Sequence, residues 1–266
     1  MKKTLIHVWT QSPCNVQVTD LAYRWGLGDQ IRSTLGTLRF CEQAGIECIV
    51  DLSLHPISAL LSLKKHKYSD VIQANKDSIK HLLTYDLDSF LKTQFSISDV
   101  AFCYVVWGVE VYSLPPTPRE LAAINELLTP NEMFARYIKD MTYAIPWPRY
   151  SILHFRLGDG EVIQEKKDTH YEPIFTIAKT HMTPTDILLS DSATFKEKCP
   201  LPLFTFKNPI AHLGFHVDAD KIKHTLFEFF LLKNASSIKT YSVYGWTSGF
   251  VTVASYLYKI PLIKIQ

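Results

Sequence analysis

From residue 151 to the end of the chain, short apolar segments alternate with stretches of helical length. The expected strands are residues 151–155, 186–190, 203–206, 240–244 and 262–265, and the expected helices are residues 171–181, 218–234 and 248–258. A parallel sheet with crossover helices is the economical fold for this alternation. Such a sheet binds ligands at the carboxyl ends of its strands, so we expect a site just after residues 155, 190, 206 and 244.

Two prolines interrupt the chain just before this region. Pro146 and Pro148 stand in the segment 143–150, where they prevent a helix or a central strand from passing through. A chain of 266 residues is long enough for two modest domains. We therefore expect an N-terminal domain over residues 1–145 and a C-terminal domain over residues 146–266.

The N-terminal half also combines helices and strands. We expect strands at residues 4–10, 46–52 and 101–107, and helices at residues 29–44 and 78–95. Two more helices are expected from about residues 118 and 130, because Thr117 with Glu120 and Thr129 with Glu132 have the spacing of capping boxes. The sequence therefore predicts an α/β fold for both domains.

Charge and cysteine content narrow the functional classes. A net charge of +2 is too small to indicate a nucleic-acid-binding surface, so we expect no nucleic-acid partner. The five cysteines are odd in number and contain no C-x-x-C pair, which favours reduced thiols and a cytoplasmic location. The apolar segment near the N-terminus is too short for a signal peptide, and no segment reaches the length of a transmembrane span.

The strongest local signal follows the first expected strand of the C-terminal half. His154, Arg156, Gly158 and Asp159 lie at the carboxyl end of that strand, within the segment His-Phe-Arg-Leu-Gly-Asp-Gly. Arginine offers a fixed fork of donors for phosphate oxygens, and glycine lets the backbone approach a ligand closely. This pattern indicates an anion site. An ordinary surface turn closed by Arg156 and Asp159 is the alternative.

A second signal precedes the last expected helix. Thr247, Ser248, Gly249 and Phe250 open that helix directly after a strand. The unpaired N–H groups and the dipole of a helix N-terminus attract phosphate, and the two hydroxyls add donors. A plain serine N-cap is the alternative.

Three weaker signals complete the set of candidate residues. Asp191 and Ser192 follow another strand, where they are expected to bind a nucleoside or to cap the next helix. Gly26 and Gly28 precede the first helix, but the third glycine of a dinucleotide fingerprint is missing. His212 lies in a strand-to-helix loop where it would touch a donor. With His216 and Asp218 it could be taken for a metal ligand, but no second cluster completes a site, so we expect no metal site.

Three of these segments, residues 26–30, 154–159 and 246–250, together resemble the fucosyltransferase superfamily, which includes the α1,2-, α1,6- and protein O-fucosyltransferases. Its hallmark His-x-Arg-x-Gly-Asp is matched at His154, Arg156, Gly158 and Asp159. The resemblance implies a GT-B architecture of two facing Rossmann-like domains with parallel sheets. It also implies that the C-terminal domain binds GDP-fucose while a glycan or glycoprotein acceptor approaches from the N-terminal domain.

The same resemblance assigns roles to individual residues. Arg156 would neutralise charge on the departing diphosphate, the segment Ser248–Phe250 would hold the same phosphates, and Asp191 would contact the nucleoside. Transfer would need no metal ion, since Arg156, the helix start at Ser248 and nearby amides replace the cation that other transferases use. It would need no cofactor, since the nucleotide sugar is itself a substrate. An inverting transfer needs a base for the acceptor hydroxyl. Asp29 is the first candidate, with helix capping as its alternative role, and Glu161 is the second.

Other functions remain open at this stage. A related transferase using a xylose or rhamnose donor would keep the phosphate site and change the sugar pocket. A non-catalytic protein that binds a sugar nucleotide or a glycan would keep the same fold. An NAD-dependent enzyme is disfavoured because the dinucleotide fingerprint is incomplete.

Overall fold

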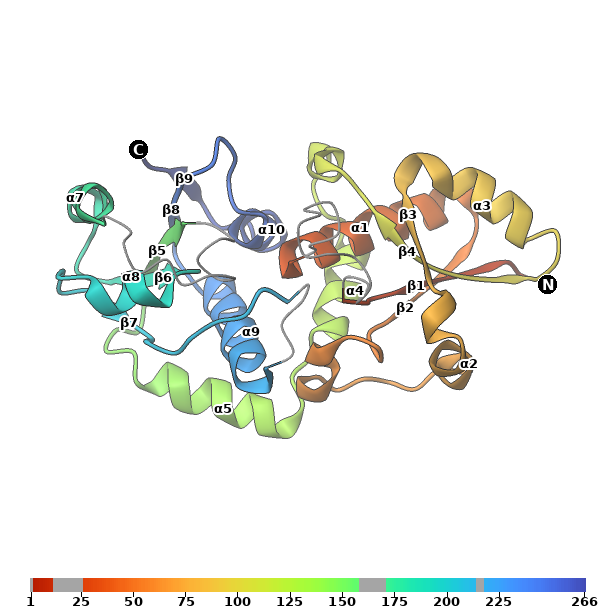
Figure 1. Ribbon diagram of the computed structural model, residues 1–266, viewed down its shortest axis with the longest axis horizontal. Helices are drawn as coiled ribbons and strands as arrows, with labels where there is room; N and C mark the ends of the chain where they lie inside the picture. The colour runs from red at the N-terminus through yellow and green to blue at the C-terminus, as the bar shows by residue number, and fades with distance from the viewer. Residues whose placement is uncertain (1, 12–25, 158–170, 214–217) are drawn as a thin grey trace. The chain divides into compact units, whose positions relative to one another are not determined.

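The computed structural model describes residues 2–11, 26–157, 171–213 and 218–266. The chain divides into two compact units, Met1–Phe134 and Ala135–Gln266, each with its own parallel sheet (Figure 1). The α/β class with parallel sheets, expected from the alternation of elements, is confirmed. The units are described separately below.

The first unit is built on a sheet with the strand order β2-β1-β4-β3 in its described residues. The strands are β1 (Thr4–Val8), β2 (Glu47–Asp51), β3 (Lys80–Leu83) and β4 (Val100–Val106). The helices are α1 (Leu27–Ala44), α2 (Ser69–Ala74), α3 (Leu87–Gln94), α4 (Pro118–Leu127) and the start of α5 (Glu132–Tyr143). Short 3₁₀ helices lie at Pro56–Leu60, Lys76–Ser78, Thr84–Asp86 and Val109–Ser113.

Strand β1 is the centre of the first core, and all five of its residues are buried. Its side chains alternate between the two faces of the sheet, as strand geometry requires. Leu5 packs in one apolar cluster with Leu91 of α3 and Val105 of β4. Ile6 packs in a second cluster with Ile72 of α2. A strand buried on both faces is typical of parallel sheets covered by helices.

One helix and one helix cap expected in the first unit are wrong. Residues 78–95 do not form one helix, because Lys80–Leu83 pairs with β4 as an edge strand and only Leu87–Gln94 is α-helical. The helix expected from residue 130 begins at Glu132, with Asn131 accepting the Phe134 N–H at 2.9 Å. Thr129 is not its cap, because the chain at Pro130 pairs with Leu61. The capping box of Thr117 and Glu120 is present as expected.

The second unit has the strand order β7-β6-β5-β8-β9, and every pair is parallel. The strands are β5 (Ser151–Arg156), β6 (Asp186–Ser190), β7 (Phe204–Thr205), β8 (Ile238–Ser242) and β9 (Leu262–Lys264). The helices are α7 (Glu172–His181), α8 (Ala193–Lys198), α9 (Ala219–Lys233) and α10 (Gly249–Tyr258). Within this unit the central strand β5 comes first, β6 and β7 follow on one side of it, and β8 and β9 then follow on the other side. The topological switch point therefore lies between β5 and β8.

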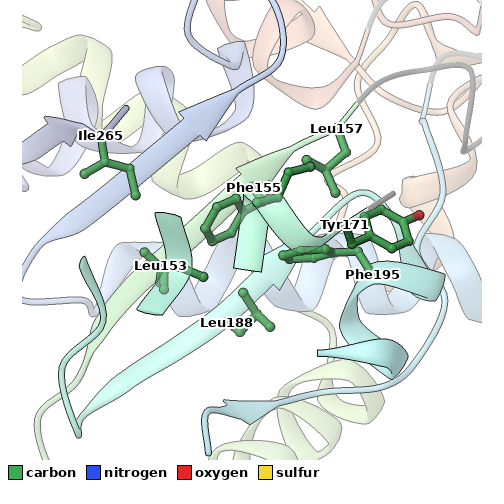
Figure 2. Close-up of a cluster of buried hydrophobic side chains, with 9 residues drawn as sticks. Leu153, Phe155, Leu157, Tyr171, Leu188, Phe195 and Ile265 are labelled. Carbon is green, nitrogen blue, oxygen red and sulfur yellow. The ribbon is translucent and has the colours of Figure 1, made fainter. Parts of the chain in front are cut away.

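One face of the second sheet carries an aromatic core. Figure 2 shows Phe155 of β5 beside Phe195 of α8 and Tyr171, with Leu153 and Leu188 on the same face. The rings of Phe155 and Phe195 have centroids 5.1 Å apart. These contacts fix β5 against α8, so the residues at the ends of β5 and β6 are held in place by the core.

The division of the chain falls inside α5, before the proline segment. Tyr137 of α5 bonds to His224 of α9 at 2.6 Å and packs against Phe227, so most of α5 belongs to the second unit. The domain boundary between residues 145 and 146 stays a prediction. None of the helices in the described parts of the chain is long and apolar enough to cross a membrane. The cytoplasmic location also stays a prediction.

Candidate functional site at the strand ends of the second unit

Arg156 is the last residue of β5, and its side chain meets Asp191 at the end of β6. Nη1 of Arg156 lies 3.1 Å from Oδ2 of Asp191, and the two side chains are 21% and 6% exposed. The other oxygen of Asp191 accepts the backbone N–H of Leu157 at 2.8 Å. One carboxylate therefore holds both the guanidinium and the backbone at the end of β5. Arginine has five N–H groups in a planar fork, and this ion pair fixes the orientation of that fork.

This pairing changes the interpretation of Asp191. The sequence suggests a nucleoside contact or a helix cap, whereas the structure shows the carboxylate positioning Arg156. The cap of α8 is Ser192, whose Oγ accepts the Phe195 N–H at 3.0 Å. Ser192 also contacts the Tyr171 hydroxyl at 3.1 Å. The nucleoside contact of Asp191 and the donor-binding role of Ser192 stay predictions.

His154 lies within the sheet, two residues before Arg156. It is 5% exposed, and its Nδ1 is 3.0 Å from the Thr240 hydroxyl on β8. Burial, together with the positive charge of Arg156, lowers the pKa of His154 to about 3. The imidazole is therefore neutral at physiological pH and joins β5 to β8 at the switch point. Its assignment as a donor ligand stays a prediction.

The loop from β8 to α10 forms the other side of the switch point. Ser242 is the parallel partner of Arg156, and the Val243 N–H donates to the Arg156 carbonyl at 3.0 Å. Ser248 occupies the N-cap position of α10 and is 7% exposed, yet its side chain makes no capping hydrogen bond. Its backbone carbonyl accepts the Thr252 N–H and hydroxyl. A serine at this position whose hydroxyl does not cap the helix leaves that hydroxyl available to a ligand.

The neighbours of Ser248 have different environments. Thr247 and Gly249 are half-buried. Phe250 packs edge-on against Phe229 of α9, with centroids 5.6 Å apart, so its ring belongs to the contact between α9 and α10. Trp246 is 68% exposed and stacks on Tyr244.

The glycine segment of the first unit forms the start of α1. Gly26 is the N-cap residue, Gly28 is buried in the first turn, and Asp29 is the third helical residue. Oδ2 of Asp29 accepts the Gly26 N–H at 3.2 Å, and Oδ1 pairs with Arg32 at 2.7 Å. Asp29 therefore takes part in capping α1, as its alternative role predicted. The role of Asp29 as the base stays a prediction.

His212 lies in the irregular segment between β7 and α9 and is half-buried. Its neighbour Ala211 is fixed by Thr225 of α9, whose hydroxyl accepts the Ala211 N–H at 2.7 Å and lies 3.0 Å from the Ala211 carbonyl. Within the described residues, no group of three or more His, Cys, Asp or Glu side chains is placed to hold a metal ion. Gly158, Asp159 and Glu161 lie outside the described residues.

A buried ion pair near this site has no obvious sequence signal. Lys196 of α8 lies 3.0 Å from Glu228 of α9, and the two side chains are 0% and 5% exposed. Lys196 also donates to the Asn208 carbonyl at 3.1 Å. Burial raises the pKa of Glu228, and the negative charge of Asp191 adds to this effect, while Lys196 opposes it. The pair joins α8 to α9 directly after the turn that contains Asp191.

Comparison with solved structures shows that the chain has a known fold. The chain resembles the NodZ α1,6-fucosyltransferase crystallised with GDP, with a TM-score of 0.54 and 14% identity over 99% of this chain and 95% of NodZ. Another structure of the fucosyltransferase NodZ, from Bradyrhizobium, gives 0.54 and 13% over the same shares of the two chains. A mutant of Arabidopsis thaliana FUT1 in complex with GDP gives 0.54 and 14% over 99% and 70%.

The chain has the fold of the NodZ fucosyltransferase. The resemblance drawn from the three sequence segments is therefore confirmed for the fold. No protein-family model matches the sequence, and no curated protein is significantly similar to it.

The burial of His154 gives a testable pH dependence. Its pKa is about 3 in the folded protein and about 6.5 as a free side chain, so below about pH 6.5 the unfolded chain binds a proton that the folded protein does not. Stability from this residue is therefore present above pH 6.5 and is lost as pH falls toward 3. Replacing His154 with Gln should reduce the slope of the unfolding free energy by up to about 1.4 kcal/mol per pH unit. Urea denaturation between pH 4.5 and 7 measures this, and equal slopes would contradict a neutral buried imidazole.

Proposed function

We propose that the chain is a glycosyltransferase that transfers fucose from GDP-fucose to a hydroxyl of a glycan or protein, with inversion and without a metal ion. Support comes from the fold, which is shared with proteins whose structures contain GDP or were soaked with GDP-fucose. The observation that carries the proposal is the guanidinium of Arg156, fixed by Asp191 beside the switch point of the second sheet.

Arg156 supplies the positive charge that the reaction needs. In a single displacement, the acceptor oxygen forms a bond to the anomeric carbon while the bond from that carbon to the phosphate oxygen breaks. The electron pair of the broken bond leaves with GDP, which gains negative charge. A guanidinium held beforehand by Asp191 stabilises that charge without reorganising during the step. The acceptor proton passes to a base.

The N-terminus of α10 provides a second group for the diphosphate. The Ser248 hydroxyl does not cap the helix, so it can donate to a phosphate oxygen. The N–H groups of the first turn and the hydroxyl of Thr247 can donate to the same phosphate. Together with Arg156 they replace the divalent cation that other transferases use against leaving-group charge.

A donor assay tests the function directly. Purified protein is incubated with GDP-fucose, GDP-mannose, a rhamnose donor and a xylose donor in excess EDTA, and release of the nucleoside diphosphate is measured. We expect turnover with GDP-fucose. Turnover only with a rhamnose or xylose donor would move the proposal to that sugar, and activity that returns only with Mg²⁺ or Mn²⁺ would refute metal independence. Binding of GDP without turnover of any donor would favour a non-catalytic binding protein.

Arg156 is the residue with the largest expected effect. Replacement by Ala should lower kcat by about 10²- to 10³-fold, the cost of losing one preorganised donor to a developing anion. Arg156→Lys keeps a cation for Asp191 but loses the planar fork, so we expect at least about a tenfold decrease. Exposed Arg149, just before β5, provides the matched control Arg149→Lys, which should retain wild-type kinetics. A lysine variant with wild-type kcat/KM would contradict the diphosphate role.

Asp29 is the first candidate for the base, and Glu161 is the second. Asn at position 29 can still accept the Gly26 N–H and cap α1, but it cannot take up a proton. If Asp29 is the base, Asp29→Asn should lower kcat by about a hundredfold or more with little change in melting temperature. Asp88, an exposed acid in the first turn of α3, provides the control Asp88→Asn. Unchanged kcat in Asp29→Asn would eliminate this residue, and Glu161→Gln would then be the next variant to test.

A further inference from the structure

Two aromatic side chains stack on each other in the loop between β8 and α10. The rings of Tyr244 and Trp246 have centroids 4.8 Å apart and planes inclined by only 14°. Trp246 is 68% exposed, and Val243 in the same loop is 47% exposed. Other rings of this unit, among them Phe155 and Phe195, are buried in the core. The stacked pair is therefore a preformed apolar surface that faces water.

This surface lies beside the candidate phosphate site. The loop begins at Ser242, the strand partner of Arg156, and its Val243 N–H bonds to the Arg156 carbonyl. It ends at Ser248, the N-cap of α10. The Tyr244 N–H donates to the Ser242 hydroxyl at 3.2 Å, which fixes the first ring of the pair to the end of the strand. The two rings therefore belong to the same edge of the sheet as Arg156.

An exposed tryptophan ring that is already stacked favours binding of a ligand that covers it. Aromatic rings bury large apolar areas when they find a partner, and an exposed apolar surface next to polar groups often marks a binding site. Because one side of the stack is already covered by its own partner, a ligand gains contact with a rigid ring without first ordering it.

We propose that Tyr244 and Trp246 form a stacking platform for a pyranose ring of the carbohydrate acceptor. The proposal rests on the transferase function above, and it adds the chemical class of the acceptor. A pyranose presents a face of C–H groups that packs on an aromatic ring, while its hydroxyls remain in water at the edge of the site. The guanine of the donor fits less well, because a phosphate and a ribose separate it from the phosphate that carries the sugar.

Calorimetric titration with two kinds of ligand tests the platform. The oligosaccharide probes are chitotetraose, cellotetraose and maltotetraose, and the nucleotide probe is GDP. For the tetrasaccharide that binds wild-type protein best, Trp246→Ala should weaken affinity at least about tenfold, as expected for an aromatic anchor. Trp246→Phe keeps a smaller ring and should give an intermediate loss. The affinity for GDP should change by less than about twofold in both variants.

Exposed Tyr143 of α5 supplies the matched control, since Tyr143→Ala removes a ring that is 91% exposed and lies outside the loop. This variant should bind every probe as wild-type protein does. Unchanged oligosaccharide affinity in Trp246→Ala would overturn the platform, as would wild-type protein that binds none of the tetrasaccharides. An equal loss of GDP affinity would assign the rings to the nucleobase and also overturn it. Failure of wild-type protein to bind GDP would instead count against the proposed transferase. The oligosaccharide affinities would still test the stacking platform.

Discussion

Strand β5 pairs in parallel with both β6 and β8, and the candidate site depends on that arrangement. Parallel strands end at the same edge of a sheet, so the residues that follow β5, β6 and β8 are brought together although they lie far apart in the sequence. Because the chain leaves the central strand first to one side and later to the other, β5 and β8 border the topological switch point. Open α/β sheets bind ligands at such a point, at the carboxyl ends of their strands. Arg156 is at that point because it is the last residue of the central strand.

Charge compensation determines how Arg156 is held at this edge of the sheet. A cation as little exposed as Arg156 needs a partner, and Asp191 provides it while also accepting the Leu157 N–H. The pair orients the guanidinium at the end of β5. The buried pair of Lys196 and Glu228 joins α8 to α9. Removing one member of such a pair would leave a buried charge without compensation and destabilise the fold.

The sequence predicted the elements with strong local signals and failed where distant residues decide. Strand β6 was predicted at its observed bounds, and the capping box of α4 was found from Thr117 and Glu120. The expected helix over residues 78–95 failed because pairing with β4 makes Lys80–Leu83 a strand. Strand β8 was expected two residues too late, since Val243 and Tyr244 look like strand residues but lie in the loop. The pairing of Arg156 with Asp191 joins residues 35 positions apart (191 − 156), and no local pattern encodes it.

The groups proposed to bind phosphate and those proposed to bind the acceptor are held in different ways. Arg156 is at the end of a hydrogen-bonded strand and paired with a buried carboxylate, while Ser248 begins a ten-residue helix that packs against α9. Trp246 is held by its stack on Tyr244, which is in turn anchored to Ser242. Substitutions at Val243 or Trp246 therefore change exposed rings and side chains without breaking the sheet ladder or the core. Under the two proposals, binding of the donor diphosphate and binding of the acceptor sugar would depend on separate contacts, so the loop could change its sugar surface while Arg156 and Ser248 stay in place.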